Sequence, residues 1–250
     1  GTQGMGQGLE TAFSQLLSGQ LEIPIEAIRV VQGDSARVKG LGSFGSRSLV
    51  VGGSVLQVGA QEFLEKGKQL AAAELEAAIV DMHYHEGRFK VVGTSIGIGL
   101  FELAASQAEH SFSTETEKEV EGRSWPNGCH IAEVEIDPET GSVRLVSHGS
   151  VEDAGNLINP MIVEGQLQGG IAQGAGQALL ELSEYDSEGQ LLTGSFMDYA
   201  MPRADDLPFF NTNIYTDAPC KTNPLGAKGV GENGVVGSIP AIANAVFDVL

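Results

Sequence analysis

Basic residues are scarce in this sequence. Its 250 residues include 14 Lys and Arg against 33 Asp and Glu, which gives a formal net charge of −19 at pH 7. A surface of that sign repels phosphate backbones and anionic lipids. We therefore expect neither nucleic acid nor a membrane surface as a partner.

Cysteines and long apolar runs are also rare. Cys129 and Cys220 form no CxxC pair and no disulfide framework, which suits a reducing, cytoplasmic compartment. No run approaches the ~18 apolar residues of a membrane helix. The opening residues lack the basic start and apolar core of a secretory signal. The chain begins without Met and stops inside an apolar, helix-like run, so we expect both ends to be cut from a longer protein.

Glycine, in contrast, is abundant. The 34 glycines fall in clusters, which indicates loops with positive φ or close backbone approach rather than a flexible linker. Three Gln- or Glu-bearing stretches, GMGQGLETAF, EGQLQGGIAQGAG and GVGENGVVGSIPAIANA, each read as a glycine loop leading into a small-residue helix. They could converge on one ligand, or they could resemble each other by chance in a glycine-rich chain.

Hydrophobic periodicity predicts a mixture of helices and strands. We expect helices over 9–18 (stopped by Gly19), within 49–83, over 98–109, over 161–182 and at the C-terminal end. We expect strands over 28–34 and 87–93, a long hairpin over 130–155 and a second hairpin turning at 187–189. The charge run 115–123 reads as a solvated edge. No βαβαβ alternation occurs, so we predict an α+β fold with mixed sheets and packed helices, in one domain over residues 1–250.

A dinucleotide site is the obvious interpretation of the glycine loops. Residues 229–234 (GVGENG) and 40–45 (GLGSFG) both match G-x-G-x-x-G, but the motif requires a strand directly before it. The preceding NPLGAK cannot be a buried parallel strand, and Glu232 would lie where a pyrophosphate approaches. The sequence therefore does not favour NAD binding.

Side chains that could hold a metal do not cluster. His83 and His85 would share one face of a strand, but no further ligand completes a site, and the other three histidines are isolated. Any metal would therefore be carried by a cofactor rather than held by side chains.

The segment 40–48, GLGSFGSRS, is suited to a phosphate. Small residues, hydroxyls and Arg47 precede a predicted helix, so backbone N–H groups, the helix dipole and the guanidinium can act on one anion. Serines before a helix are also ordinary N-caps, and this alternative stays open.

Taken in order, six motifs resemble one family. GMGQG, GSFGSRS, EVEIDPETG, INPMIVEGQLQGGIAQG, SFMDYAMP and NPLGAKGVGENG are similar to the C-terminal part of the molybdenum-binding large subunit of xanthine dehydrogenase-type hydroxylases. This family includes aldehyde oxidoreductases, xanthine dehydrogenases and aerobic carbon monoxide dehydrogenases. The resemblance spans the whole chain and implies the molybdenum cofactor-binding domain of molybdenum hydroxylases.

The resemblance implies a molybdopterin cofactor, expected as the cytosine dinucleotide, that carries the molybdenum. The residues matching the family's cofactor-binding segments are Met5, Gly6, Gln7, Gly45, Ser46, Arg47, Ser48 and Gln166. Glu232 matches the carboxylate that faces the molybdenum, where it would act as the general base in oxidative hydroxylation of an aldehyde, an N-heterocycle or CO.

The same resemblance implies partners. The remainder of the large subunit, a small iron–sulfur subunit and an FAD subunit would complete the enzyme, and a homo-oligomer is expected. The alternative is a degenerate relative that serves as an assembly or binding module without turnover. The presence of Gln7, Gln166 and Glu232 favours the enzyme.

Overall fold

The computed structural model describes residues 1–119 and 123–250. Its contacts divide the chain into two compact units. Unit 1 comprises Gly1–Gly122 and Thr222–Leu225, and unit 2 comprises Arg123–Lys221 and Gly226–Leu250. Each unit combines helices with a small sheet, which confirms the mixed α+β fold. One domain over residues 1–250 stays a prediction, because two contact units can belong to one domain.

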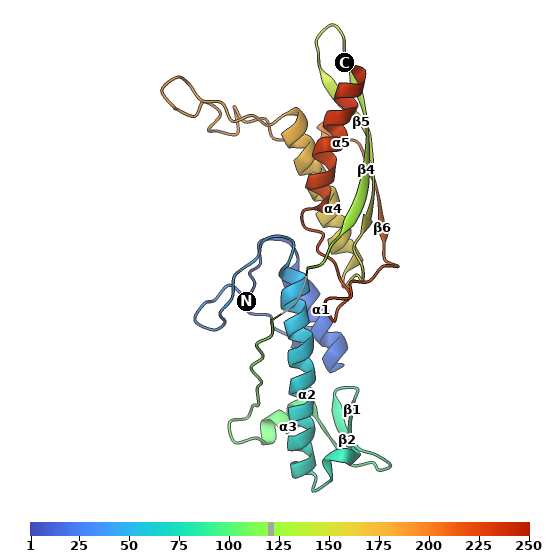
Figure 1. Ribbon diagram of the computed structural model, residues 1–250. Helices are drawn as coiled ribbons and strands as arrows, with labels where there is room; N and C mark the ends of the chain where they lie inside the picture. The colour runs from blue at the N-terminus through green and yellow to red at the C-terminus, as the bar shows by residue number, and fades with distance from the viewer. Residues whose placement is uncertain (120–122) are drawn as a thin grey trace. The chain divides into compact units, whose positions relative to one another are not determined.

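Unit 1 is organised around its longest helix, α2 (Figure 1). Its helical elements are α1 (Leu9–Leu21), the short turns η1 (Ile25–Ala27), η2 (Leu49–Gly53) and η3 (Ile79–Asp81), α2 (Ser54–Glu74) and α3 (Leu100–Ser106). An antiparallel sheet joins β1 (Met82–His85), β2 (Arg88–Val91) and β3 (Gly97–Gly99) in that order. The turn η2 is π-helical and continues directly into α2.

The core of unit 1 forms where the sheet meets α2. Phe89 of β2 is fully buried with Leu103 of α3 and Ala71 of α2. Its ring lies against Gly67, where an added Cβ would be 2.4 Å from the ring. A glycine in the middle of α2 thus makes room for the largest side chain of the core.

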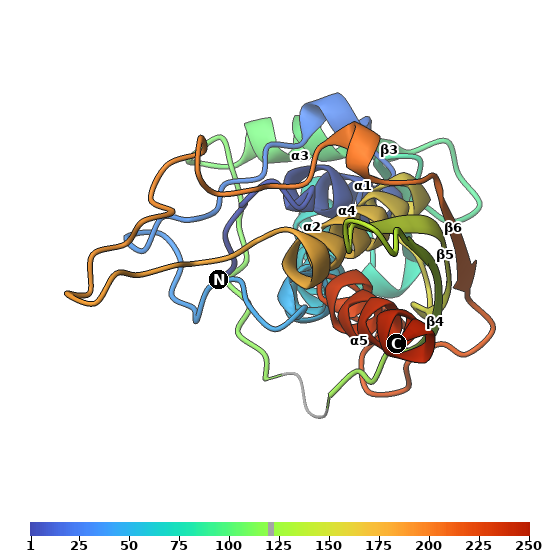
Figure 2. The ribbon, with the colours of Figure 1, turned by 90° about the horizontal axis from the view of Figure 1, so that it is seen from above.

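Unit 2 is a three-stranded sheet covered on one face by two helices. Its elements are β4 (Asn127–Ile136), β5 (Val143–Asp153), α4 (Pro160–Leu179), η4 (Ala204–Asp206), β6 (Phe210–Tyr215) and α5 (Asn233–Val249). β4 and β5 form the predicted hairpin, and β6 pairs with β5 in parallel. Figures 1 and 2 show α4 and α5 side by side on the same face of this sheet.

Glycines allow α4 and α5 to cross closely. An added Cβ at Gly234 would lie 2.3 Å from the carbonyl oxygen of Leu167, and one at Gly174 would lie 2.0 Å from Oγ of Ser238. At Gly234 any side chain would push against the backbone of α4, and at Gly174 it would meet the Ser238 side chain and, at 3.2 Å, the Val235 carbonyl oxygen. The small-residue character of these helices is therefore a requirement of their packing.

Several predicted elements differ in the structure. α1 continues through Gly19 to Leu21 and ends at Glu22, whose backbone is left-handed, so Gly19 is not the stop. Residues 28–34 form no strand within the described chain, because this half-exposed segment has no strand beside it. The middle glycine-rich stretch lies inside α4 rather than in a loop.

Two further predictions are partly met. The turn at 187–189 forms, but only one bridge, between Tyr185 and Leu191, supports the predicted second hairpin. The charge run is solvent-exposed at most positions of 115–119, whereas residues 120–122 lie outside the described part of the chain. β6 was not predicted.

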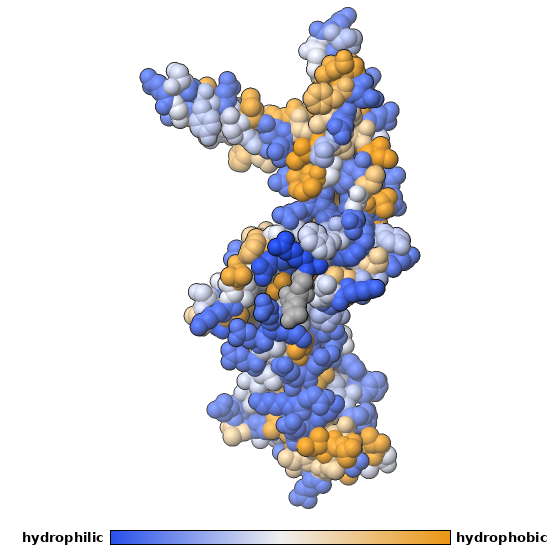
Figure 3. Space-filling model, in the orientation of Figure 1, coloured by the Kyte–Doolittle hydropathy of each residue, from blue (hydrophilic) through white to orange (hydrophobic). Residues whose placement is uncertain are grey.

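Exposed apolar side chains of α5 include Val236, Phe247 and Val249, and Figure 3 shows apolar surface over the part of unit 2 that contains this helix. In the described residues, we find no helix with both the length and the apolar character needed to span a membrane.

Candidate functional site

Two of the predicted cofactor-binding segments lie side by side in unit 1. The N-terminal loop is joined to the 40–48 segment by paired hydrogen bonds: the Gln3 N–H donates to Oγ of Ser43 (2.9 Å), and the Ser43 hydroxyl donates to the Gln3 carbonyl (2.7 Å). The N–H of Gly42 also donates to the carbonyl of Gly1 (3.1 Å). The fold thus brings together segments about 40 residues apart in sequence.

Gln7 gives the N-terminal loop its shape. Its Oε1 accepts from the N–H of Met5, and its Nε2 donates to the carbonyl of Gln3. The chain bends at Gly6, whose φ of 95° is left-handed and favours glycine. Met5 is 61% exposed as a result. The side-chain amide of Gln7 supports the loop, which leaves the Met5–Gly6 backbone on the surface.

The 45–48 segment carries the donors expected of an anion site. Gly45 and Ser46 are both left-handed, with φ of 57° and 54°, which is a strained conformation for serine. The guanidinium of Arg47 lies 4.9 Å from the ring centre of Phe44, a cation–π distance that restrains the long side chain. Ser48 makes no side-chain cap to the following π-helical turn. The N-cap interpretation of this serine is therefore not what the geometry favours.

In unit 2, the glycine loop before α5 is anchored to the end of β5. The ammonium group of Lys228 pairs with the carboxylate of Asp153, and the Lys228 N–H donates to the carbonyl of Ala154 (2.9 Å). Glu232 follows in an exposed position and precedes α5 as its N-cap residue, with its carbonyl accepting from the N–H of Val236 (3.0 Å). The loop therefore presents this carboxylate from a fixed helix end.

Gln166 and Glu232 lie near the crossing of α4 and α5. Gln166 is half-exposed on α4 and adjoins Leu167, the residue whose carbonyl faces Gly234. Gly234 is two residues after Glu232. The close crossing thus places the backbones of both predicted site residues in one region of unit 2.

A buried polar cluster that is not predictable from the sequence lies beneath the start of α5. Glu152 of β5 contacts His130 of β4 through Oε1, while its Oε2 accepts from Nδ2 of Asn233 (2.9 Å). The side chains of His130 and Glu152 are only 5% and 2% exposed. His148 lies beside them, with ring centres of the two histidines 5.2 Å apart. The two histidines are 18 residues apart in the sequence and therefore look isolated there, whereas the pairing of β4 with β5 brings them together.

Burial governs the ionisation of His148. Its pKa is lowered from 6.5 to about 4, chiefly by loss of hydration and secondly by the neighbouring His130, while Glu152 opposes the shift. Neither ring nitrogen of His148 has a hydrogen-bond partner within the described residues. His148 is thus a neutral core histidine at physiological pH.

The predicted site residues fall into two groups. Met5, Gly6, Gln7 and the 45–48 segment belong to unit 1, whereas Gln166 and Glu232 belong to unit 2. Within each unit the predicted segments are brought together.

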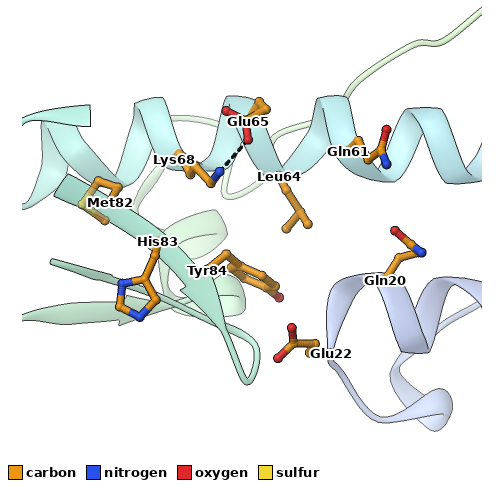
Figure 4. A pocket seen from close by; sticks show the side chains of 9 residues that line it. All are labelled: Gln20, Glu22, Gln61, Leu64, Glu65, Lys68, Met82, His83 and Tyr84. Carbon is orange, nitrogen blue, oxygen red and sulfur yellow. Dashed lines mark hydrogen bonds and ion pairs between the residues drawn. The ribbon is translucent and has the colours of Figure 1, made fainter. Parts of the chain in front are cut away.

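A cleft of about 350 Å³ in unit 1 contains none of the predicted site residues (Figure 4). Tyr84 projects from β1 into the space between α2 and the end of α1, and its hydroxyl donates to the carbonyl of Leu21. Burial, and then the charge of Glu22, raise the pKa of Tyr84 to about 12. Tyr84 thus has a structural role, because it packs α1, α2 and β1 together.

Among residues 1–119 and 123–250, no group of three or more His, Cys, Asp or Glu side chains is placed to hold a metal ion. The donor set of the 45–48 segment instead consists of two hydroxyls and a guanidinium, which suits the phosphate of a bound cofactor. The residues present therefore fit a cofactor that carries a phosphate.

Comparison with known proteins settles the family. The model of the molybdopterin cofactor-binding domain matches residues 1–208. The chain belongs to this family. The match includes every predicted site residue except Glu232, which lies beyond its end.

Similarity to known proteins extends over the whole chain. The chain is 36% identical to the 6-hydroxypseudooxynicotine dehydrogenase complex subunit gamma of Paenarthrobacter nicotinovorans, over 100% of its own length and 33% of that protein. It is 35% identical to the carbon monoxide dehydrogenase large chain of Hydrogenophaga pseudoflava, over 99% of its own length and 32% of that protein. It thus spans about a third of the length of these relatives.

A solved structure of this kind gives the same fold. Quinoline 2-oxidoreductase from Pseudomonas putida 86 superposes with a TM-score of 0.85 at 36% identity, covering 100% of this chain and 33% of that one. The likeness confirms the predicted molybdenum cofactor-binding fold.

Proposed function

We propose that the chain is the C-terminal part of the large catalytic subunit of a molybdenum hydroxylase and that Glu232 is its general base. The observation that carries this proposal is the placement of Glu232: an exposed carboxylate at the start of α5, on a glycine loop anchored to β5, beside the α4 segment that holds Gln166. The family match and the dehydrogenase and oxidoreductase names of the relatives support it.

The residues of unit 1 would bind the cofactor. Arg47, Ser46 and Ser48 would hold a phosphate, for which the cytosine dinucleotide form of molybdopterin is the proposed source. The surface backbone of Met5 and Gly6 would lie along the pterin, and Gln166 of unit 2 would pair with its edge. When bound, the cofactor supplies the two-electron oxidation and the oxygen atom that is transferred.

Glu232 would accept the proton released in that reaction. A general base must present an ionised carboxylate within hydrogen-bond reach of the proton. Gly229 and Gly231, which precede Glu232, carry no side chains, so a ligand can approach this part of the loop closely.

The substrate is proposed as a small molecule: an aldehyde, an N-heterocycle or CO. The remainder of the large subunit, an iron–sulfur subunit and an FAD subunit are the proposed partners, in a cytoplasmic homo-oligomer. The words "complex subunit" and "large chain" in the relatives' names agree with a multi-subunit enzyme.

The test replaces Glu232 with Gln in the full-length enzyme, with benzaldehyde, quinoline and CO as probes of the three substrate classes. Glu232→Gln keeps the size but cannot accept a proton, so turnover should fall by ~10²–10⁴-fold at unchanged molybdenum content. Glu133→Gln, at an exposed position of β4, is the control and should behave like wild type. Normal turnover of fully loaded Glu232→Gln would remove this residue from the mechanism. If loaded wild type turns over none of the probes, the alternative of a non-catalytic assembly or binding module is favoured.

A further inference from the structure

Two buried, hydrogen-bonded side chains lie beneath the start of α5, which directly follows the residue proposed as the base. Glu152 is 2% exposed at the side chain, yet it carries a carboxylate, and its partners are His130 and Asn233. Burying a carboxylate costs several kcal/mol unless its partners satisfy it. An apolar side chain at this position would pack the helix on the sheet at lower cost.

The cluster acts on the first two turns of α5. Asn233 and Gly237 are four residues apart and therefore lie on the same face of the helix. Glu152 binds Asn233, whereas the ring of His130 lies against Gly237, where an added Cβ would be 2.3 Å from it. The carboxylate–histidine pair thus holds two successive turns.

Glycines on β4 and on α5 leave room for the Glu152–His130 pair. An added Cβ at Gly128, opposite Glu152 in the β4–β5 register, would lie 2.1 Å from Oε2 of that carboxylate. With Gly237 on the helix, Gly128 leaves space for the pair between sheet and helix. The carboxylate therefore has little freedom to move away from Asn233.

We propose that Glu152, supported by His130, is a positioning residue that sets the orientation of Glu232 by holding the side chain of Asn233. Asn233 adjoins Glu232, so fixing Asn233 fixes the backbone from which the Glu232 carboxylate projects. This inference rests on the proposed function, because it concerns the base of that reaction. A displacement of about 1 Å at such a group can cost on the order of 10²-fold in rate.

The test uses Asn233→Ala in the full-length, cofactor-loaded enzyme, with the same three probes. Loss of a hydrogen bond to a charged acceptor should lower kcat by roughly ten- to hundredfold, with KM and molybdenum content near wild type. Hydrogen–deuterium exchange should accelerate at the amides of residues 232–237 and remain unchanged near the end of α5. Asn244→Ala, an exposed Asn on the same helix, is the matched control and should change neither measurement.

A double-mutant cycle identifies the partner. Glu152→Gln and Asn233→Ala should give losses in kcat that do not add, because the first weakens and the second removes the same hydrogen bond. Additive losses, unchanged exchange and kcat in Asn233→Ala, or loss of molybdenum from that variant would each overturn the positioning role. If Glu152→Gln fails to fold, Asn233→Ala alone decides by exchange and kcat.

The two proposals fail in different ways. Full activity of loaded Glu232→Gln defeats the general-base assignment. Strong loss in Glu232→Gln together with wild-type behaviour of Asn233→Ala defeats only the positioning role.

Discussion

At the scale of single residues, Arg47 tests the phosphate assignment. Arg47→Ala in the full-length enzyme should weaken cofactor retention by roughly ten- to hundredfold while leaving turnover per bound molybdenum near wild type, because a charged hydrogen bond to phosphate acts on binding. Molybdenum content after dialysis, compared with turnover per molybdenum, measures both effects. Arg37→Ala, an exposed arginine of unit 1 paired with Asp34 at 3.2 Å, is the control. Full occupancy with collapsed turnover would show that Arg47 does not bind a phosphate.

The sequence identifies site residues unevenly. Gln7, Arg47 and Glu232 can be proposed from the sequence because they stand in short glycine-rich motifs that resemble those of a known family. Glu152 cannot be found this way, since its role depends on strand register and on a helix 81 residues further along the chain. His130 likewise becomes meaningful only when paired with Glu152.

At the scale of elements, local pattern predicts most helices and the long hairpin. α2 and the β4–β5 hairpin carry clear periodicity and a Pro-Glu-Thr-Gly turn, so both are predictable. β6 is not predictable, because it pairs in parallel with a strand far away in the sequence, with His148 opposite Phe210, and no nearby turn indicates that pairing. Residues 28–34 were predicted as a strand and form none, because an apolar segment with β propensity needs a neighbouring strand to pair with.

The α4–α5 crossing depends on backbone approach and gives a prediction at this scale. Gly234→Ala should destabilise unit 2 by about 1–3 kcal/mol, because the added methyl would meet the carbonyl of Leu167, which cannot move without shifting α4. Gly165→Ala is the matched control: it lies in α4 with nothing within 4 Å of an added Cβ. That control should be neutral or stabilising by up to about 1 kcal/mol through helix propensity. Urea unfolding measures both, and equal stabilities of the two variants would contradict the close crossing.

At the scale of the whole molecule, the chain covers about a third of its relatives. Ligand sites bury some 70–90% of a bound molecule, and the residues proposed here are only part of the expected lining. We therefore expect the 250-residue chain, purified alone, to fold without retaining molybdenum. Circular dichroism and elemental analysis measure this, and near-stoichiometric molybdenum in the folded chain would contradict it.

Acid stability of the whole chain combines two opposing effects. Protonation of the 33 acidic residues relieves the repulsion behind the net charge of −19. His148 acts in the other direction. Below pH 6.5 the unfolded state protonates this histidine, while the folded state, with its pKa lowered to about 4, does not. The unfolded state then binds more protons, so the free energy of unfolding falls as the pH decreases from 6.5 to 4. Below pH 4 both states are protonated at His148, and this residue causes no further loss of stability.

The contribution of His148 over that window is about 3 kcal/mol, since the pKa difference is converted at about 1.4 kcal/mol per pH unit. His148→Gln cannot titrate, so its free energy of unfolding should fall less than that of wild type between pH 6.5 and 4, even if the variant is less stable at pH 8. His83→Gln, at an exposed position of β1, should keep the wild-type slope. Urea unfolding of the three proteins at several pH values gives the slopes. Identical slopes for wild type and His148→Gln would mean that this histidine is not held neutral in the core, and the cluster beneath α5 would then be open to water.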